Sequence, residues 1–154
     1  MEPLLSVIVP SYNVSSKIFE CFSSLDDLNN RVERLEVIFV DDKSTDDTYE
    51  KVLDFSSTRE WVSCIQLPVN TGTPSVPRNE ALKKARGTYV FHLDSDDMIL
   101  PDGILAEIAI AERTQADVVR APLLRFDGRS ELKMNVIPEW DETCLLYTSD
   151  AADD

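Results

Sequence analysis

The sequence contains no apolar run long enough to cross a bilayer, and we expect no signal peptide. A membrane-spanning helix needs about 20 consecutive apolar residues, and no run in the 154 residues approaches that length. Residues 1–6 place no basic segment ahead of their short apolar run, as a signal peptide would. We therefore expect no transmembrane segment and a cytoplasmic location, at most peripheral to the inner face of the membrane in a full-length protein.

Cysteines are few, and none of them lie close together in the sequence. The three, Cys21, Cys64 and Cys144, are odd in number and lack the short spacing of a zinc site or a redox pair. This pattern predicts buried or idle thiols in a reducing compartment.

Basic residues are also scarce, with 15 Lys and Arg against 29 acids and a net charge of −14. Such a charge repels nucleic acid phosphates and anionic membrane surfaces, so a general role in binding polyanions is excluded. An acidic protein that binds an anionic nucleotide needs a cation between the two, and a divalent metal ion is the ordinary choice.

Apolar, β-branched runs alternate with helix-forming segments over at least 120 residues. We expect strands at 6–10, 35–40, 62–67 and 88–93, and a further edge strand at 117–126. We expect helices at 15–28, after residue 47, at 79–86 and at 101–114. Alternation of this kind predicts a largely parallel, layered α/β sheet.

The expected helices carry recognisable end signals. Ser15 or Ser16 is a plausible N-cap for the first helix, and Ser44 with Asp47 imitates a capping box for the second. Gly87 follows the third as a left-handed C-cap.

Acidic residues crowd the end of the fourth expected strand, at Asp94-Ser95-Asp96-Asp97. Ligands of open α/β sheets bind beyond the carboxyl ends of the strands. Carboxylates crowded there repel one another unless a hard divalent cation lies between them, so the pattern indicates a metal site. The alternative is an acidic loop that caps the next helix. A calcium loop of the EF-hand type fits poorly, because Met98 stands where an oxygen donor is needed.

Other strand ends place nucleotide-binding side chains nearby. Asp42 could accept a hydrogen bond from the imide N–H of a base, and Tyr12 could stack on that base. Arg78 could reach a phosphate or the base. Taken singly, each has a plainer reading as a turn residue, a cover for the sheet end or a surface ion pair. His92 lies inside the fourth expected strand and is interpreted as packed or hydrogen-bonded rather than catalytic.

Three segments, SVIVPSYN, VIFVDDKSTDDT and NTGTPSVPRNEALKKARGTYVFHLDSDD, occur in this order and spacing. Together they resemble the family 2 glycosyltransferases of the GT-A fold over about residues 4–127. The resemblance implies a Rossmann-like, mostly parallel sheet flanked by helices, here truncated at its C-terminus. It implies a nucleotide-binding set of Pro10, Tyr12, Asp42, Asn70, Arg78 and Asp94, with Asn79 beside Arg78. It also implies a Mn²⁺ or Mg²⁺ motif made of Asp94, Asp96 and Asp97.

The proline-containing loop 70–79 is similar to that of glycosyltransferases for wall teichoic acid and other cell-surface polymers. This implies a UDP-sugar donor, UDP-N-acetylglucosamine or another UDP-hexose, and a glycan, polyol-phosphate or lipid-linked acceptor. Inverting transfer in the family needs a downstream carboxylate as general base. The only later candidates, Glu139, Asp141 and Glu142, do not resemble that motif, so we expect the base beyond the C-terminus and little activity from this fragment alone.

These considerations predict a domain organisation and leave two alternative functions. We expect a nucleotide-sugar-binding half at 1–129, an incomplete start of the acceptor half at 130–144, and a non-native or disordered acidic tail at 145–154. A non-catalytic nucleotide-sugar-binding module is the main alternative to a hexosyltransferase. A phosphatase of the haloacid dehalogenase type is disfavoured, because its acidic motif follows the first strand rather than the fourth.

Overall fold

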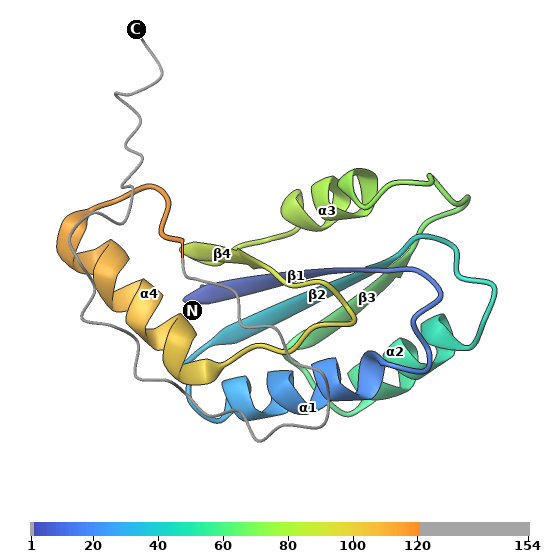
Figure 1. Cartoon of the computed structure of the whole chain (residues 1–154), viewed down its shortest axis with the longest axis horizontal. Helices are drawn as coiled ribbons and strands as arrows, with labels where there is room; N and C mark the ends of the chain where they lie inside the picture. The colour runs from blue at the N-terminus through green and yellow to red at the C-terminus, as the bar shows by residue number, and fades with distance from the viewer. Residues whose placement is uncertain (1, 121–154) are drawn as a thin grey trace, which may run out of the picture. The chain divides into compact units, whose positions relative to one another are not determined.

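The computed structural model describes residues 2–120, and four parallel strands form its centre (Figure 1). The strands are β1 (Leu5–Ser11), β2 (Leu35–Asp41), β3 (Val62–Gln66) and β4 (Tyr89–His92), in the order β3-β2-β1-β4. Every neighbouring pair is parallel. The predicted parallel α/β sheet is confirmed, and all four carboxyl ends lie at one edge.

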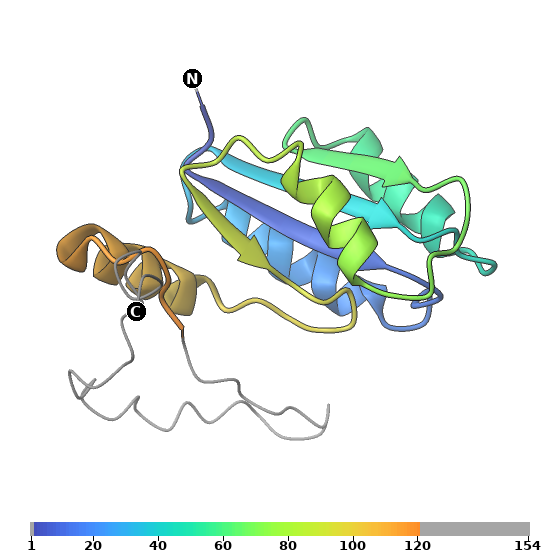
Figure 2. The same ribbon diagram turned by 90° about the horizontal axis from the view of Figure 1, so that it is seen from above.

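Helices cover both faces of this sheet. Helices α1 (Ile18–Asn29) and α2 (Thr48–Ser57) lie on one face, and α3 (Ser75–Leu82) lies on the other (Figures 1 and 2). Because they are covered on both faces, β1 and β2 are buried along their whole length. The nearly continuous apolar sequence of these two strands is what such burial requires.

Aromatic side chains fill the space between the sheet and the pair α1 and α2. Phe22 of α1 stacks on Phe55 of α2 with ring centroids 4.1 Å apart, and Phe39 of β2 meets both rings edge-on. Offset and edge-to-face contacts of this kind add to the stabilisation from burial. They tie both helices to the central strand.

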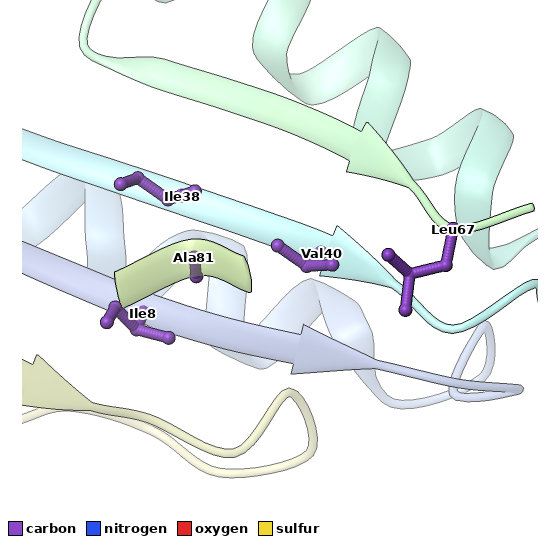
Figure 3. Close-up of a cluster of buried hydrophobic side chains, with 5 residues drawn as sticks. All are labelled: Ile8, Ile38, Val40, Leu67 and Ala81. Atoms are coloured by element: carbon purple, nitrogen blue, oxygen red, sulfur yellow. The ribbon is translucent and has the colours of Figure 1, made fainter. Parts of the chain in front are cut away.

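A smaller aliphatic cluster lies between the sheet and α3 (Figure 3). Ala81 of α3 is fully buried against β1 and β2. A side chain this small lets the helix lie close to the strands, which brings the loop before α3 toward the carboxyl edge. The cluster consists of Ile8, Ile38, Val40, Leu67 and Ala81.

The bounds predicted for the third helix are wrong. Helix α3 begins at Ser75, with Pro74 as its N-cap residue and Pro77 in its first turn, where a missing N–H costs nothing. It ends at Leu82, so Gly87 is not its C-cap. Gly87 instead lies against β1, where a Cβ atom would be only 2.5 Å from the Ser6 amide nitrogen.

The predicted N-caps are also wrong. Helix α1 begins at Ile18 with Lys17 at its N-cap, and α2 begins at Thr48 with Asp47 at its N-cap; neither cap residue makes a side-chain cap bond. Asp46 accepts a hydrogen bond from the Thr48 amide in place of the expected capping box. The hydroxyl of Ser44 bonds to Asp41.

The chain divides into two compact units, 1–101 and 102–154, which are described separately. The first holds the sheet and α1 to α3. The second contains nearly all of α4 (Pro101–Thr114), whose bounds match the prediction. Most of the edge strand predicted at 117–126, together with Glu139, Asp141, Glu142, Cys144 and the tail, lies outside the described residues. Within residues 2–120, no helix has the length and apolar character to cross a membrane.

Candidate functional site

A cleft of about 340 Å³ opens at the carboxyl edge of the sheet. The ends of β1 and β2, the loop before α3 and the loop after β4 all contribute to its walls. It brings together every residue of the predicted nucleotide-binding set and one further acid of the predicted metal motif. The predicted residues that line it are Pro10, Tyr12, Asp42, Asn70, Arg78, Asp94 and Asp96.

Two predicted residues are placed differently. Asn79 lies on α3 beside a separate, open depression that it lines with Val76 and Lys83. Asp97 is in the acidic loop, but it is not among the residues that line the cleft.

The loops that follow β1 and β2 are held together by Asn13, next to Tyr12. The Asn13 amide donates to Ser44 Oγ at 3.0 Å, and its side-chain oxygen accepts from the Thr45 amide at 2.8 Å. Ser44 is in turn held by Asp41, which is fully buried. Asn13 adopts a φ of 50°, a region that Asn tolerates better than most residues. These bonds hold the loop that carries Tyr12, whose half-exposed side chain lines the cleft.

Asp42 is buried, with 4% of its surface exposed, although it lines the cleft. Its carboxylate accepts hydrogen bonds from the Thr71 amide at 3.0 Å and from Thr71 Oγ1 at 2.9 Å. The side-chain amide of Asn70 donates to the Asp42 carbonyl oxygen at 2.9 Å. The loop 70–73 thus makes hydrogen bonds to both the main chain and the side chain of Asp42.

The acidic loop after β4 is paired with two cations. Arg78 contacts Asp94, and Lys17 lies 3.6 Å from Asp96. Burial raises the pKa of Asp97, and the negative charges of Asp96 and Asp94 raise it further against the opposing effect of Lys17. The three carboxylates are therefore close enough to repel one another.

The donor chemistry of this loop suits a hard cation. Asp94, Asp96 and Asp97 offer carboxylate oxygens, the ligands that Mg²⁺ and Mn²⁺ prefer. Over residues 2–120, no three His, Cys, Asp or Glu side chains are arranged so that they could hold a metal ion. Mg²⁺ usually binds one or two carboxylates together with substrate phosphates and water rather than an all-protein cage. An open acidic loop beside a cleft fits that mode.

Arg78 also has a free donor. Its Nε atom is buried and, among the described residues, makes no hydrogen bond. Buried polar atoms without a partner are uncommon in folded proteins and call for an explanation. A bound anion in the cleft would supply the missing acceptor.

The acidic loop is anchored to α1 by a buried serine. The Ile99 amide donates to Ser24 Oγ at 3.1 Å, and the Ser24 hydroxyl donates to the Cys21 carbonyl at 2.8 Å. Ile99 and Ser24 are both buried. These bonds fix the chain just after the acidic loop to helix α1.

Of the two alternatives predicted for His92, packing is wrong, because the residue is exposed. His92 pairs with Ile8 on the face of the sheet that carries α3, but α3 packs on β1 and β2 rather than on β4. Partial burial and the nearby charge of Arg78 lower the pKa of His92. The imidazole of His92 is therefore harder to protonate than that of a free histidine.

The described cysteines are free thiols. Burial raises the pKa of Cys21 and of Cys64 to about 12 in each case, with nearby aspartates adding to the effect. Since the thiolate is the reactive form, neither is suited to catalysis.

Three residues of the site escaped sequence reasoning: Asn13, Lys17 and Thr71. Asn13 follows Tyr12 directly, so its position in the PSYN segment was the one available signal. Lys17 and Thr71 had none, because their partners Asp96 and Asp42 lie 79 and 29 positions away.

The sequence matches the family Glycosyl transferase family 2 over residues 6–147. The chain belongs to this family. It is 36% identical over 125 residues to the poly(ribitol-phosphate) beta-glucosyltransferase of Bacillus spizizenii, covering 81% of this chain and 20% of that protein. The chain thus spans about a fifth of that relative.

Solved structures agree with this assignment and with the GT-A fold. The Staphylococcus aureus TarS fragment 1–349 in complex with UDP-GlcNAc matches with a TM-score of 0.72 and 34% identity, over 85% of this chain and 37% of that one. The mannosyltransferase PcManGT of Pyrobaculum calidifontis, in complex with GDP-Man and Mn²⁺, matches with a TM-score of 0.63 and 26% identity, over 72% and 33%.

Proposed function

We propose that this chain is the donor-binding part of an inverting, metal-dependent hexosyltransferase that uses a UDP-sugar. The observation that carries the proposal is the convergence of Tyr12, Asp42 and Arg78 with the acidic loop on one cleft. The ends of β1, β2 and β4 supply Tyr12, Asp42 and the acidic loop, and helix α3 supplies Arg78. Each offers a group suited to one part of a nucleotide diphosphate sugar.

The base would lie between Tyr12 and Asp42. The half-exposed Tyr12 ring offers a flat apolar surface, and the Asp42 carboxylate accepts an imide N–H. The diphosphate would lie beyond the base, toward Arg78. The buried Nε of Arg78 would donate to a phosphate or base oxygen, which removes the cost of leaving that atom without a partner.

A Mn²⁺ or Mg²⁺ ion would be held by Asp96 with Asp94 or Asp97. When bound, such an ion supplies positive charge that neutralises the diphosphate and stabilises the phosphate that departs from the sugar. The protein's part is to present the carboxylates at the edge of the cleft with Lys17 and Arg78 as counter-charges. The Mn²⁺ complex of PcManGT supports this proposal.

The names of the relatives support a particular donor and acceptor. The Bacillus spizizenii protein is a glucosyltransferase for poly(ribitol-phosphate), and TarS is crystallised with UDP-GlcNAc. We infer a UDP-hexose donor and a polyol-phosphate polymer as acceptor. The general base that inverting transfer requires is proposed to lie beyond residue 154.

Calorimetric titration with UDP, with and without Mn²⁺, tests the donor site. We expect Mn²⁺ to strengthen UDP binding by the wild-type chain. Asp96→Ala should lower the affinity in Mn²⁺ by about a hundredfold, since a lost metal ligand removes most of the metal's contribution. Asp27→Ala, an exposed acid on α1, serves as the matched control and should bind UDP as the wild type does.

Two outcomes would contradict the proposal. If the folded wild-type chain binds UDP with the same affinity with and without Mn²⁺, the proposed metal site is contradicted. Metal-dependent binding by a longer parent protein that transfers no sugar would favour the non-catalytic nucleotide-sugar-binding module.

A further inference from the structure

Thr71 contacts the cleft only through another residue. It is not among the residues that line the cleft, whereas its neighbours Asn70 and Gly72 are. Its side chain and amide both point to the carboxylate of Asp42, 29 positions earlier in the chain. Any effect of Thr71 on a ligand is therefore exerted through Asp42.

The bonds from Thr71 constrain the Asp42 carboxylate closely. Oδ1 accepts both the Thr71 amide, at 3.0 Å, and Thr71 Oγ1, at 2.9 Å, while Oδ2 shares the same amide at 3.1 Å. The hydroxyl also lies 3.2 Å from the Thr73 carbonyl oxygen, but the carboxylate is the nearer and the charged acceptor. With Asp42 only 4% exposed, these contacts hold the carboxylate in one orientation.

The acceptor capacity left to Asp42 decides what the cleft can recognise. A carboxylate offers about four acceptor positions and no donor. Thr71 takes up two positions on Oδ1, so the free capacity is concentrated on Oδ2. Uracil presents an N–H at ring position 3, whereas cytosine presents an acceptor there, which a carboxylate repels.

We propose that Thr71 is a positioning residue for base selection, whose hydroxyl orients the Asp42 carboxylate so that it accepts the imide N–H of uracil. The inference rests on the proposed function, because it takes the cleft to hold a uridine nucleotide. It goes further by assigning the discrimination between uracil and cytosine to the Thr71–Asp42 pair rather than to Asp42 alone.

The test compares UDP with CDP on the full chain in the presence of Mn²⁺. Thr71→Val removes the hydroxyl while the shape and the backbone amide remain. We expect it to lower the UDP-over-CDP preference about tenfold, the size of one lost hydrogen bond to a charged group. The change should fall on UDP, with CDP affinity nearly unaltered. A merely structural role would weaken both nucleotides alike.

Two further variants separate the hydroxyl from the packing of the side chain. Thr71→Ser keeps the hydroxyl and should retain the wild-type preference, whereas Thr71→Ala should lose it as Thr71→Val does. If Thr71→Val fails to fold, the Ser and Ala pair decides the question. Thr88→Val, at an exposed threonine before β4, is the control and should match the wild type.

The outcomes distinguish this inference from the proposed function. A wild-type chain that binds neither nucleotide overturns both. A wild-type chain that prefers UDP, with Thr71→Val equally selective at an unchanged melting temperature, overturns the role of Thr71 and leaves the donor site standing. Loss of selectivity in Thr71→Ser also overturns it, because the hydroxyl would then be insufficient.

Discussion

Two acidic sites at opposite ends of the strands show how the same chemical group serves different purposes. Glu36 lies near the amino end of β2, and Asp97 lies in the loop after the carboxyl end of β4. Burial acts to raise the pKa of both carboxyls. The pKa of Glu36 is nevertheless lowered, whereas that of Asp97 is raised.

The difference comes from the partners. Glu36 accepts hydrogen bonds from Ser6 Oγ at 2.6 Å, from the Arg86 amide at 2.9 Å and from the Arg86 guanidinium at 2.7 Å. The negative charges of Asp96 and Asp94 raise the pKa of Asp97, and the charge of Lys17 acts against them. A carboxylate supplied with every donor it needs stabilises the fold. A group of carboxylates left under-compensated at a cleft is a candidate for ligand binding.

The largest effect on UDP binding is expected from the arginine at the carboxyl edge of the sheet, Arg78, and not from the one at the amino edge, Arg86. Arg78→Met should weaken UDP binding about a hundredfold, because the charge-assisted hydrogen bond from Arg78 Nε to the ligand is lost. It should change the melting temperature little. Arg86→Met is the counterpart at the amino edge and should lower the melting temperature while UDP affinity stays the same. Calorimetry measures the UDP affinity of both variants, and thermal unfolding measures their melting temperatures. If both variants weakened UDP binding equally, the two edges would not differ in function.

Glu36→Gln should reduce the free energy of unfolding by about 2 kcal/mol at neutral pH, since buried donors on Ser6 and Arg86 lose a charged acceptor. Because the pKa of Glu36 in the folded state lies below its ordinary value of 4.5, its contribution is complete above pH 4.5. It is lost as the pH falls through the lowered pKa. Denaturant unfolding from pH 7 to pH 3 should show the wild type and Glu36→Gln converging at the acid end. A constant difference across that range would contradict the assignment.

Asp97→Asn should stabilise the fold at neutral pH, whereas Glu36→Gln destabilises it. A carboxyl whose pKa is raised on folding contributes stability below its ordinary value of 3.8, and this is lost as the pH rises through the raised pKa. At neutral pH the charge is unfavourable, so removing it should raise the melting temperature by ~1–3 °C in the absence of metal, a small effect because solvent screens the exposed loop. Thermal unfolding in a chelator measures the change. A lower melting temperature would mean that Asp97 is a structural acid, as Glu36 is.

Lys17→Met should produce the smallest effect. Lys17 lies 3.6 Å from Asp96 with most of its side chain exposed, and exposed ion pairs contribute little. Releasing Asp96 should raise the affinity for Mn²⁺ by ~2-fold to 3-fold at low salt. Lys83→Met, which breaks an ion pair with Glu80 on α3, is the control. Weaker Mn²⁺ binding in Lys17→Met would show that Lys17 helps the site instead of competing for it.

Sequence reasoning located the acids and Arg78 because each belongs to a pattern that is local in the chain. Asp42 and Asp94 each follow an apolar run, and parallel strands bring such positions to one edge. The same reasoning misplaced α3. Residues 74–78 were read as a proline-rich loop, yet prolines are tolerated in a helix's first turn, where amide groups have no intrahelical acceptor.

Asn13 and Thr71 mark the limit of that approach. Each is a small polar residue in a loop, and such residues usually do no more than bond to their own turn. Their importance comes from partners 31 and 29 positions away. The position of Gly87 after a helix-forming segment likewise predicts a helix cap, whereas the structure shows that it packs against β1.

The sequence alone was sufficient to determine the alternation of strands and helices, the parallel sheet and the edge at which the acidic loop lies. These follow from apolar periodicity and from the position of polar residues along the chain, which are properties of neighbours in sequence. The tertiary structure decided which carboxylates are satisfied and which are exposed to a ligand. That outcome depends on donors brought from distant segments, as Arg86 is brought to Glu36 and Thr71 to Asp42.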